Sequence, residues 1–295
     1  MDHLDVFQRD LTHEFDSIYI IESLPDGALK TGSSLYDDVL GPAAFDQNLH
    51  VRLLIARSKT EFISHLRTIK DEVVQNNYSP ILHFDAHGSP DGLELADGSS
   101  IAWHEVFDLF QSINVASRFN LLVVLAACSG IYLQNVVLPH RAAPLWGLIG
   151  PTKIVSAGEI HIRFRRFYRE YLETVDPTRA MEALNDAPLG TRWTYGFRSA
   201  ANLFREAWRQ YALGFLDPVV ARQRFKEFAG ATPALIDADE STQERILRNT
   251  LTEHGFFLER FASRFFMYDT FPENVSRFPV DAEPLVREVL REWHE

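Results

Sequence analysis

Cysteine is almost missing from this sequence, which has Cys128 as its single cysteine among 295 residues. An intramolecular disulfide is therefore excluded, and disulfide bonds cannot stabilise the fold. With 46% hydrophobic residues, the chain is long enough to form one large core or two smaller ones without such crosslinks. A single free cysteine is most often a small buried hydrophobic residue, so its neighbours must decide whether it has a chemical role.

Basic residues are also scarce, with 29 Lys and Arg against 41 Asp and Glu, and the net charge is −12. The average surface therefore repels a phosphate backbone, and direct binding of nucleic acid is not expected. A local basic patch formed by Arg163, Arg165, Arg166 and Arg169 would be the exception.

Long apolar runs are absent, since no stretch approaches the ~20 apolar residues that a membrane span needs. The opening residues MDHLDVFQRD also lack the basic start and apolar run of a secretion signal. We therefore expect a soluble, cytoplasmic protein without a membrane partner.

Short apolar runs alternate with amphipathic segments over residues 1–190, which predicts an α/β fold with a mostly parallel sheet flanked by helices. The runs expected to form strands are Ser17–Ser23, Val51–Arg57, Pro80–Ala86, Asn120–Ala126 and Trp146–Ser156. The segments expected to form helices are Lys59–Gln75, Trp103–Ile113 and Ile160–Thr174. The last of these should bury its aromatic residues and keep its arginines in water.

Two further features complete the expected organisation. The segment Gly92–Ser99 has the Asp-Gly signal of a small hairpin, which would follow directly after His87 and Gly88. Residues 191–295 show mainly helical patterns and predict an α-helical C-terminal region, although RWTYGF at its start is compatible with a last strand of the sheet.

Two strands end in turns that carry reactive side chains. ILHFDAHGSP leads to His87, and NLLVVLAACSG leads to Cys128, 41 positions later. The carboxyl ends of parallel strands are where open α/β sheets place their sites. A thiol needs a base, and acyl transfer needs backbone N–H donors for the oxyanion, which small residues such as Gly88 make accessible. The pair therefore predicts a cysteine nucleophile assisted by a histidine.

The segments LHFDAHG, LELADG and LLVVLAACSG together resemble the CHAT family, which is caspase-like and includes relatives of separase. The resemblance covers about Ser17–Leu184 and implies a caspase-hemoglobinase fold with cysteine endopeptidase activity. It implies that His87 is the general base and acid, that Cys128 is the nucleophile, and that the N–H groups of Gly88 and Cys128 form the oxyanion hole. It also implies substrate-binding residues near GLIGPTKIVSAGE.

The expected substrate-binding residues are Asp85, Ala126 and Glu159. Caspases have Gln and metacaspase-like proteins have Asp two positions before the nucleophile, whereas this chain has Ala126. Either Asp85 or Glu159 could favour a basic P1 residue, and each could equally be a structural or solvated carboxylate.

Two alternatives remain open at the level of the sequence. His83, Asp85 and His87 alternate along one strand and share a face, as the ligands of a metal-dependent hydrolase would. The fold could also serve as a catalytically silent interaction scaffold. The favoured interpretation needs no cofactor and no metal. Its partners are one or a few protein substrates and a regulatory protein or effector, in a setting of bacterial stress or defence.

Overall fold

The computed structural model describes residues 15–47, 49–186, 194–216 and 257–294, together with a few positions between 239 and 249. These residues divide into two compact units. The first comprises Met1–Val136 and Ala143–Ala200, and the second Val137–Ala142 and Ala201–Glu295. Each unit is described separately below.

A mostly parallel sheet forms the centre of the first unit, with the strand order β2-β1-β3-β6-β7-β8. Only β8 is antiparallel to its neighbour along this order. The strands are β1 (Ser17–Ser23), β2 (His50–Ile55), β3 (Pro80–Ser89), β6 (Leu122–Ala126), β7 (Gly147–Pro151) and β8 (Tyr195–Ser199). All residues of β1, β6 and β7 are buried, as expected for strands covered on both faces.

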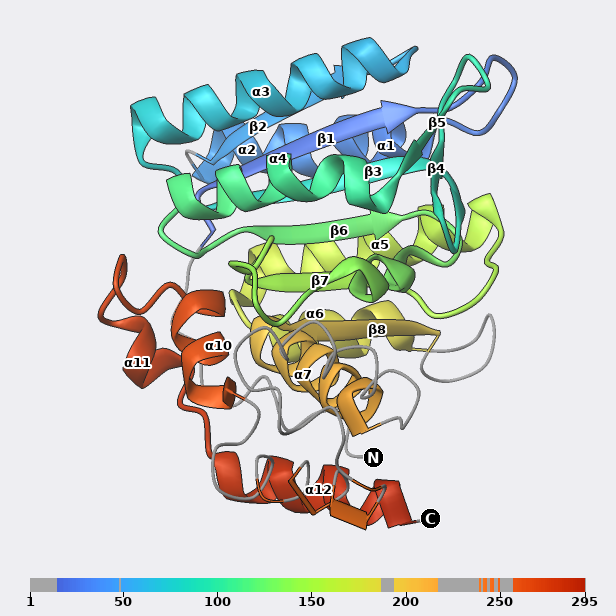
Figure 1. The fold of residues 1–295 in the computed structure, drawn as a ribbon. Helices are drawn as coiled ribbons and strands as arrows, with labels where there is room; N and C mark the ends of the chain where they lie inside the picture. The colour runs from blue at the N-terminus through green and yellow to red at the C-terminus, as the bar shows by residue number, and fades with distance from the viewer. Residues whose placement is uncertain are drawn as a thin grey trace. The chain divides into compact units, whose positions relative to one another are not determined.

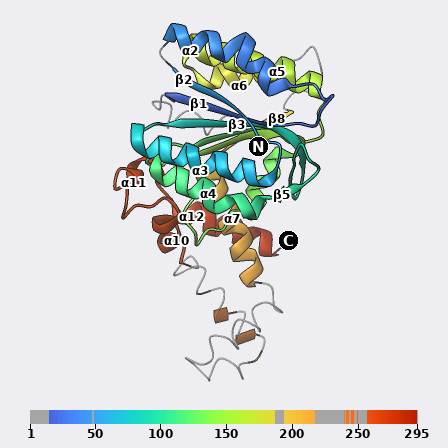
Figure 2. The same cartoon turned by 90° about the horizontal axis from the view of Figure 1, so that it is seen from above.

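Helices cover both faces of this sheet (Figure 2). One face is covered by α3 (Lys59–Asn76) and α4 (Trp103–Ala116), whose Phe62 and Phe110 pack against Phe84 of β3. The other face is covered by α5 (Ala157–Thr174), whose Phe164 and Tyr168 lie against His83 of the same strand. The expected α/β class with flanking helices is therefore confirmed.

The sequence patterns missed several short helices on the α5 side. These are α1 (Thr31–Leu35), the π-helical turn η1 (Tyr36–Leu40), α2 (Gly41–Gln47) and α6 (Pro177–Asn185). The first three lie next to one another in the sequence, and each is shorter than the two turns over which an amphipathic pattern becomes visible.

A hairpin stands at the carboxyl end of β3, where β4 (Gly92–Glu94) pairs with β3 and β5 (Ser100–Ala102) pairs with β4 (Figure 1). The Asp97-Gly98 turn closes it, with Gly98 at φ +80° and the Gly98 N–H donating to the carbonyl of Leu95. The hairpin predicted from this dipeptide is confirmed.

The expectation that every arginine of α5 faces water is wrong. The aromatic residues Phe164, Phe167 and Tyr168 are buried as predicted, but Arg163 is also buried, with 1% of its surface exposed. Its Nη1 donates to the carbonyl oxygen of Leu184 at 2.8 Å, and its Nε lies 2.9 Å from a carboxylate oxygen of Glu159. A buried guanidinium requires partners for its N–H groups. One of these partners is a carbonyl group of α6, which the sequence alone does not place next to Arg163.

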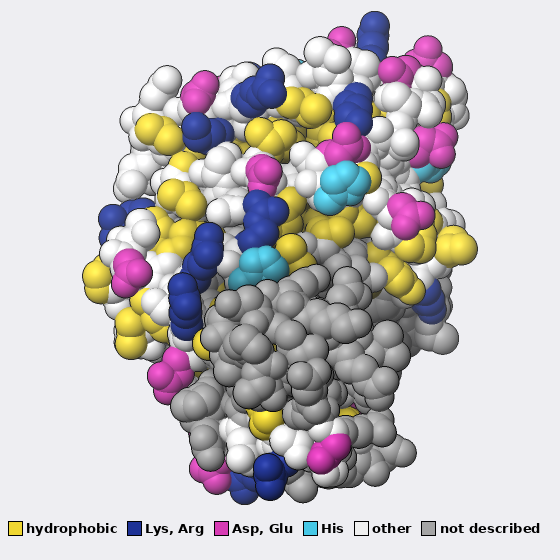
Figure 3. Space-filling view, in the orientation of Figure 1, with side chains coloured by type: hydrophobic (Ala, Val, Ile, Leu, Met, Phe, Trp, Pro, Cys, Tyr) yellow, Lys and Arg dark blue, Asp and Glu magenta, His cyan; other side chains and the backbone are white. Residues whose placement is uncertain are grey.

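Arg163 therefore cannot belong to a surface patch, and Arg165 is paired with Asp38 at 2.5 Å. On the face that carries α3 and α4, basic and acidic side chains are interspersed among the described residues (Figure 3).

The described part of the second unit is helical. It contains α7 (Ala200–Leu216), α10 (Leu258–Phe265), α11 (Asn274–Arg277) and α12 (Ala282–His294). Ion pairs from Arg205 to Glu288 and from Arg209 to Glu292, each at 2.5 Å, join α7 to α12. No described helix in either unit is long and apolar enough to cross a bilayer.

The first unit continues to Ala200, beyond the boundary expected at residue 190, because β8 pairs with β7. The segment RWTYGF thus contributes to a strand of the sheet. Of the helical patterns expected in residues 191–295, Pro218–Phe228 and part of Ser241–Phe266 lie outside the described residues.

Candidate active site

His87 lies near the end of β3, and Cys128 follows β6, the strand beside it in the sheet. Strands β3 and β6 are parallel, and the last residues paired between them are Asp85 and Ala126. His87 and Cys128 each come two positions later, at the same edge of the sheet. The two turns predicted to lie at the ends of neighbouring parallel strands do so.

Gly88 brings the two strand ends into direct backbone contact. A Cβ atom placed on Gly88 would lie 2.2 Å from the carbonyl oxygen of Cys128 and 3.0 Å from its amide nitrogen. No other residue type fits there without a shift of the backbone. The glycine after His87 therefore allows the histidine strand to approach the backbone of Cys128.

Cys128 lies in a tight turn that packs against the end of its own strand, β6. The N–H of Gly130 donates to the carbonyl of Ala127 at 3.1 Å, and Ser129 has φ +57°, a left-handed conformation that is uncommon for serine. A Cβ on Gly130 would lie 2.6 Å from Cβ of Leu125, so this turn folds back onto its own strand. Left-handed non-glycine residues of this kind concentrate at functional sites.

The thiol of Cys128 is half-buried and contacts the segment that joins β7 to α5. Its Sγ lies 3.4 Å from the carbonyl oxygen of Val155 and 3.5 Å from the amide nitrogen of the same residue. The carbonyl can accept the S–H proton, and the N–H can donate to a thiolate. Val155 belongs to the segment GLIGPTKIVSAGE that the family resemblance associates with substrate binding. The next residue, Ser156, caps α5 by accepting a hydrogen bond from the N–H of Glu159 at 3.1 Å.

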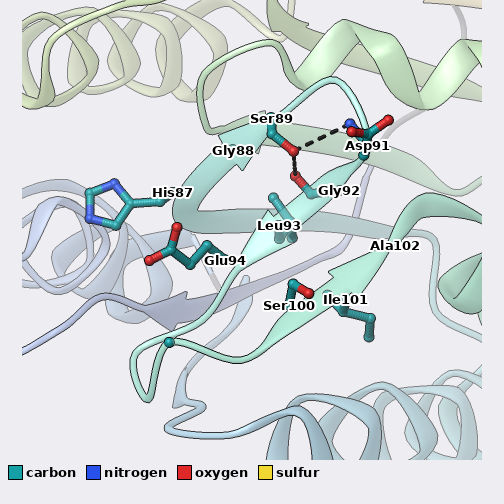
Figure 4. Close-up of a pocket in the computed structure, with 11 residues that line it drawn as sticks. His87, Gly88, Ser89, Asp91, Gly92, Leu93, Glu94, Ser100, Ile101 and Ala102 are labelled. Carbon is teal, nitrogen blue, oxygen red and sulfur yellow. Dashed lines mark hydrogen bonds between the residues drawn. The ribbon is translucent and has the colours of Figure 1, made fainter.

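The imidazole of His87 is exposed at a cavity of about 360 Å³ (Figure 4). The cavity is formed by the end of β3 and by the hairpin, and its lining includes His87, Gly88, Asp91, Glu94, Ser100 and Ala102. Its volume is suited to one or two side chains of a peptide. The hairpin predicted to follow His87 and Gly88 therefore forms the wall of a recess beside the histidine.

Asp85 lies beneath the first turn of α1. Its side chain is 2% exposed, and its Oδ2 accepts hydrogen bonds from the Thr31 hydroxyl at 2.5 Å and from the amide of Gly32. Burial raises the pKa of Asp85 to about 7, and the neighbouring carboxylate of Glu22 adds to this rise. Through these contacts Asp85 holds the first turn of α1 against the sheet. The same hydrogen bonds explain how its carboxyl group can be buried, so no bound ligand is needed to explain it.

The other two expected substrate-binding residues are also engaged elsewhere. Ala126 is fully buried in β6, and Glu159 is paired with Arg163 at 2.9 Å. Asp85, Ala126 and Glu159 do not belong to the lining of the cavity beside His87. Their role in substrate binding remains a prediction.

The three residues of the metal alternative are not assembled into a ligand set. His83 is buried, its Nδ1 is 3.1 Å from the hydroxyl of Tyr168, and burial lowers the pKa of His83 to about 3. Asp85 is occupied by α1, whereas His87 is exposed at the cavity. Within the described ranges, no three His, Cys, Asp or Glu side chains are placed to hold a metal ion. His83 is a core histidine, and the geometric basis of the metal alternative is lost.

Tyr195 is a residue near this site that the sequence did not single out. It lies at the start of β8, opposite Pro151 of β7, and its ring packs against Phe164 and Arg163 of α5. Burial raises the pKa of Tyr195 above its ordinary value, and the charges of Glu159 and Cys128 add to this. The Tyr195 hydroxyl is buried without a hydrogen-bond partner among the described residues. The sequence could not predict that Tyr195 lies near this site, because a single tyrosine in a possible strand forms no recognisable motif.

No protein-family model matches the chain, and no curated protein shows significant similarity to it.

Proposed function

We propose that this chain is a cysteine endopeptidase of the caspase-like kind in which His87 and Cys128 form the catalytic dyad. The observation that carries the proposal is the backbone contact between Gly88 and Cys128 at the ends of two adjacent parallel strands. It is supported by the exposed imidazole of His87 beside a recess, and by the resemblance of the HFDAHG and LAACSG segments to the CHAT family.

In the proposed reaction, the imidazole of His87 takes the proton of the Cys128 thiol. The thiolate attacks the carbonyl carbon of the scissile peptide bond, and the N–H groups of Gly88 and Cys128 stabilise the oxyanion. The imidazolium then gives its proton to the leaving amine, and a thioester remains on Cys128. A water molecule activated by the same imidazole hydrolyses the thioester and restores the thiol.

The biological setting proposed here rests on the family resemblance alone. One or a few specific proteins would be the substrates, and a regulatory protein or effector would control activity in the cytoplasm of a bacterium under stress or attack. No metal or other cofactor takes part in this mechanism.

The single cysteine allows a direct test, because every thiol label reports Cys128. We expect iodoacetamide to alkylate the wild-type protein at least about tenfold faster at pH 7 than the His87→Ala variant, since the histidine activates the thiol. His140→Ala is the matched control, because His140 is an exposed histidine of the second unit that is not part of the cavity lining, and its loss should leave the rate unchanged. Equal rates in wild type and His87→Ala would overturn the dyad.

Cleavage of a peptide library by wild type, with Cys128→Ala as the inactive reference, then tests the reaction itself. Cleavage after Arg or Lys would implicate Asp85 or Glu159, and cleavage after small or apolar residues would fit Ala126. A reactive thiol with no cleavage of the library or of denatured proteins would favour the interaction scaffold instead.

A further inference from the structure

Glu94 lies directly across the hairpin from the proposed catalytic histidine. The antiparallel pairing of β3 with β4 places His87 opposite Glu94, and β5 places Ser100 on the other side of Glu94. Directly opposed residues of an antiparallel pair project to the same face, with Cβ atoms about 5 Å apart. His87, Glu94 and Ser100 thus form one row across three strands, and all three line the cavity.

Figure 4 shows the consequence of this register. The side chains of His87 and Glu94 leave the hairpin in the same direction, and the carboxylate lies beside the imidazole. Asp91, the other carboxylate of the lining, lies at the far end of the recess and points away from the ring.

The backbone of Glu94 is held in place from the opposite face of the hairpin. Its neighbours Leu93 and Leu95 are buried, with 2% and 1% of their surfaces exposed. The turn that sets the register is also fixed, because the Ser89 hydroxyl donates to the carbonyl of Gly92 at 3.3 Å and accepts from the N–H of Asp91 at 3.2 Å. The carboxylate therefore stands on a rigid element, as a positioning group requires.

We propose that Glu94 is a positioning residue for His87. The two side chains are not hydrogen-bonded in the described structure. In the proposed step the carboxylate accepts a hydrogen bond from one ring N–H of His87, which selects one tautomer and leaves the second nitrogen free to take the thiol proton. The carboxylate also stabilises the imidazolium formed in that step. This inference rests on the proposed function, because it assigns Glu94 a task within the same dyad.

The test combines two measurements on Glu94→Ala, Glu94→Asp and the matched control Asp71→Ala, which removes an exposed carboxylate of α3 outside the cavity lining. Both positions are exposed, so the fold should tolerate each change. The first measurement is the rate of alkylation of Cys128 by iodoacetamide at pH 7. We expect Glu94→Ala to slow it about two- to fivefold, as the loss of one exposed charge contact predicts. Glu94→Asp should restore most of the rate, and Asp71→Ala should leave it unchanged.

The second measurement is the nitrogen NMR signature of the His87 ring at pH 8. One tautomer should dominate in wild type and in Asp71→Ala, and Glu94→Ala should show a mixture of both.

The outcomes separate this proposal from the proposed function. If His87→Ala slows alkylation but Glu94→Ala behaves as Asp71→Ala does in rate or in tautomer, only the role of Glu94 is overturned. If His87→Ala does not slow alkylation, the proposed function is overturned and the role of Glu94 falls with it, whatever the ring signals show.

Discussion

The carbonyl oxygen of Cys128 faces the α-carbon of Gly88 so closely that a methyl group on Gly88 would lie 2.2 Å from it. This contact joins the two strand ends that carry the proposed dyad. It occurs beyond the last paired residues of β3 and β6, where no ladder of hydrogen bonds holds the chains together. The spacing between the strand ends that carry His87 and Cys128 therefore depends on Gly88 having no side chain.

Replacing Gly88 with alanine should separate the two strand ends. The new methyl group would meet backbone atoms that cannot rotate away, so we expect a loss of about 1–3 kcal/mol in unfolding free energy. Alkylation of Cys128 should also become slower, because His87 moves with the strand. Urea unfolding and iodoacetamide labelling measure the two effects.

Gly158→Ala is the control for this prediction. A Cβ on Gly158 would meet nothing within 4 Å, and the residue lies in the first turn of α5. Alanine there should be neutral or stabilise the helix by up to about 1 kcal/mol. An unchanged labelling rate in Gly88→Ala would show that the contact does not set the geometry of the dyad.

Tyr195→Phe should stabilise the protein, although it removes a polar group. The hydroxyl is buried and has no hydrogen-bond partner among the described residues, so its removal should raise the unfolding free energy by about 1 kcal/mol. Tyr168→Phe provides the opposite case, because the hydroxyl of Tyr168 is 3.1 Å from Nδ1 of His83. That variant should lose about 1 kcal/mol. Thermal unfolding of both variants checks the signs, and a loss of stability in Tyr195→Phe would contradict the assignment.

The sequence predicted the main strands and long helices because their patterns are periodic over many residues. The strand Ser17–Ser23 is reproduced without change, and Lys59–Gln75 differs from α3 by one residue. The placement of His87 and Cys128 at the same edge of the sheet was also predictable, since both residues follow buried apolar runs.

Other features of the site could not be predicted from local patterns. The burial of Asp85 depends on α1, a five-residue helix whose position on the sheet is set by tertiary contacts. The burial of Arg163 depends in the same way on the carbonyl of Leu184. The position of Glu94 opposite His87 was predictable in principle. The segment Ser89-Pro90-Asp91-Gly92 has the composition of a tight turn, and a two-residue connection there sets His87 opposite Glu94.

Asp85 should make the folded protein less stable as the pH rises. Its pKa is raised to about 7 in the folded state, chiefly by burial, whereas the carboxyl group in the unfolded chain titrates near its ordinary value of 3.8. Between about pH 4 and 7 the folded protein therefore keeps a proton that the unfolded chain has released. The unfolding free energy then falls with rising pH, by up to about 1.4 kcal/mol per pH unit. Asp85→Asn should remove this contribution to the pH dependence of the unfolding free energy, which urea unfolding at several pH values would show.

His83 should have the opposite effect over nearly the same range of pH. Burial lowers its pKa to about 3, so between about pH 3 and 6.5 the unfolded chain binds a proton that the folded protein does not. The unfolding free energy therefore rises with pH across this window, and this rise largely cancels the decline caused by Asp85.

Each single variant should consequently reveal the contribution of the other residue. In Asp85→Asn the unfolding free energy should increase from pH 4 to 6.5, because the His83 contribution is no longer offset. In His83→Gln, which keeps an acceptor for the Tyr168 hydroxyl, it should decrease over the same range. The double variant should show neither slope. Parallel curves for wild type and both single variants would mean that neither group changes its protonation when the protein unfolds.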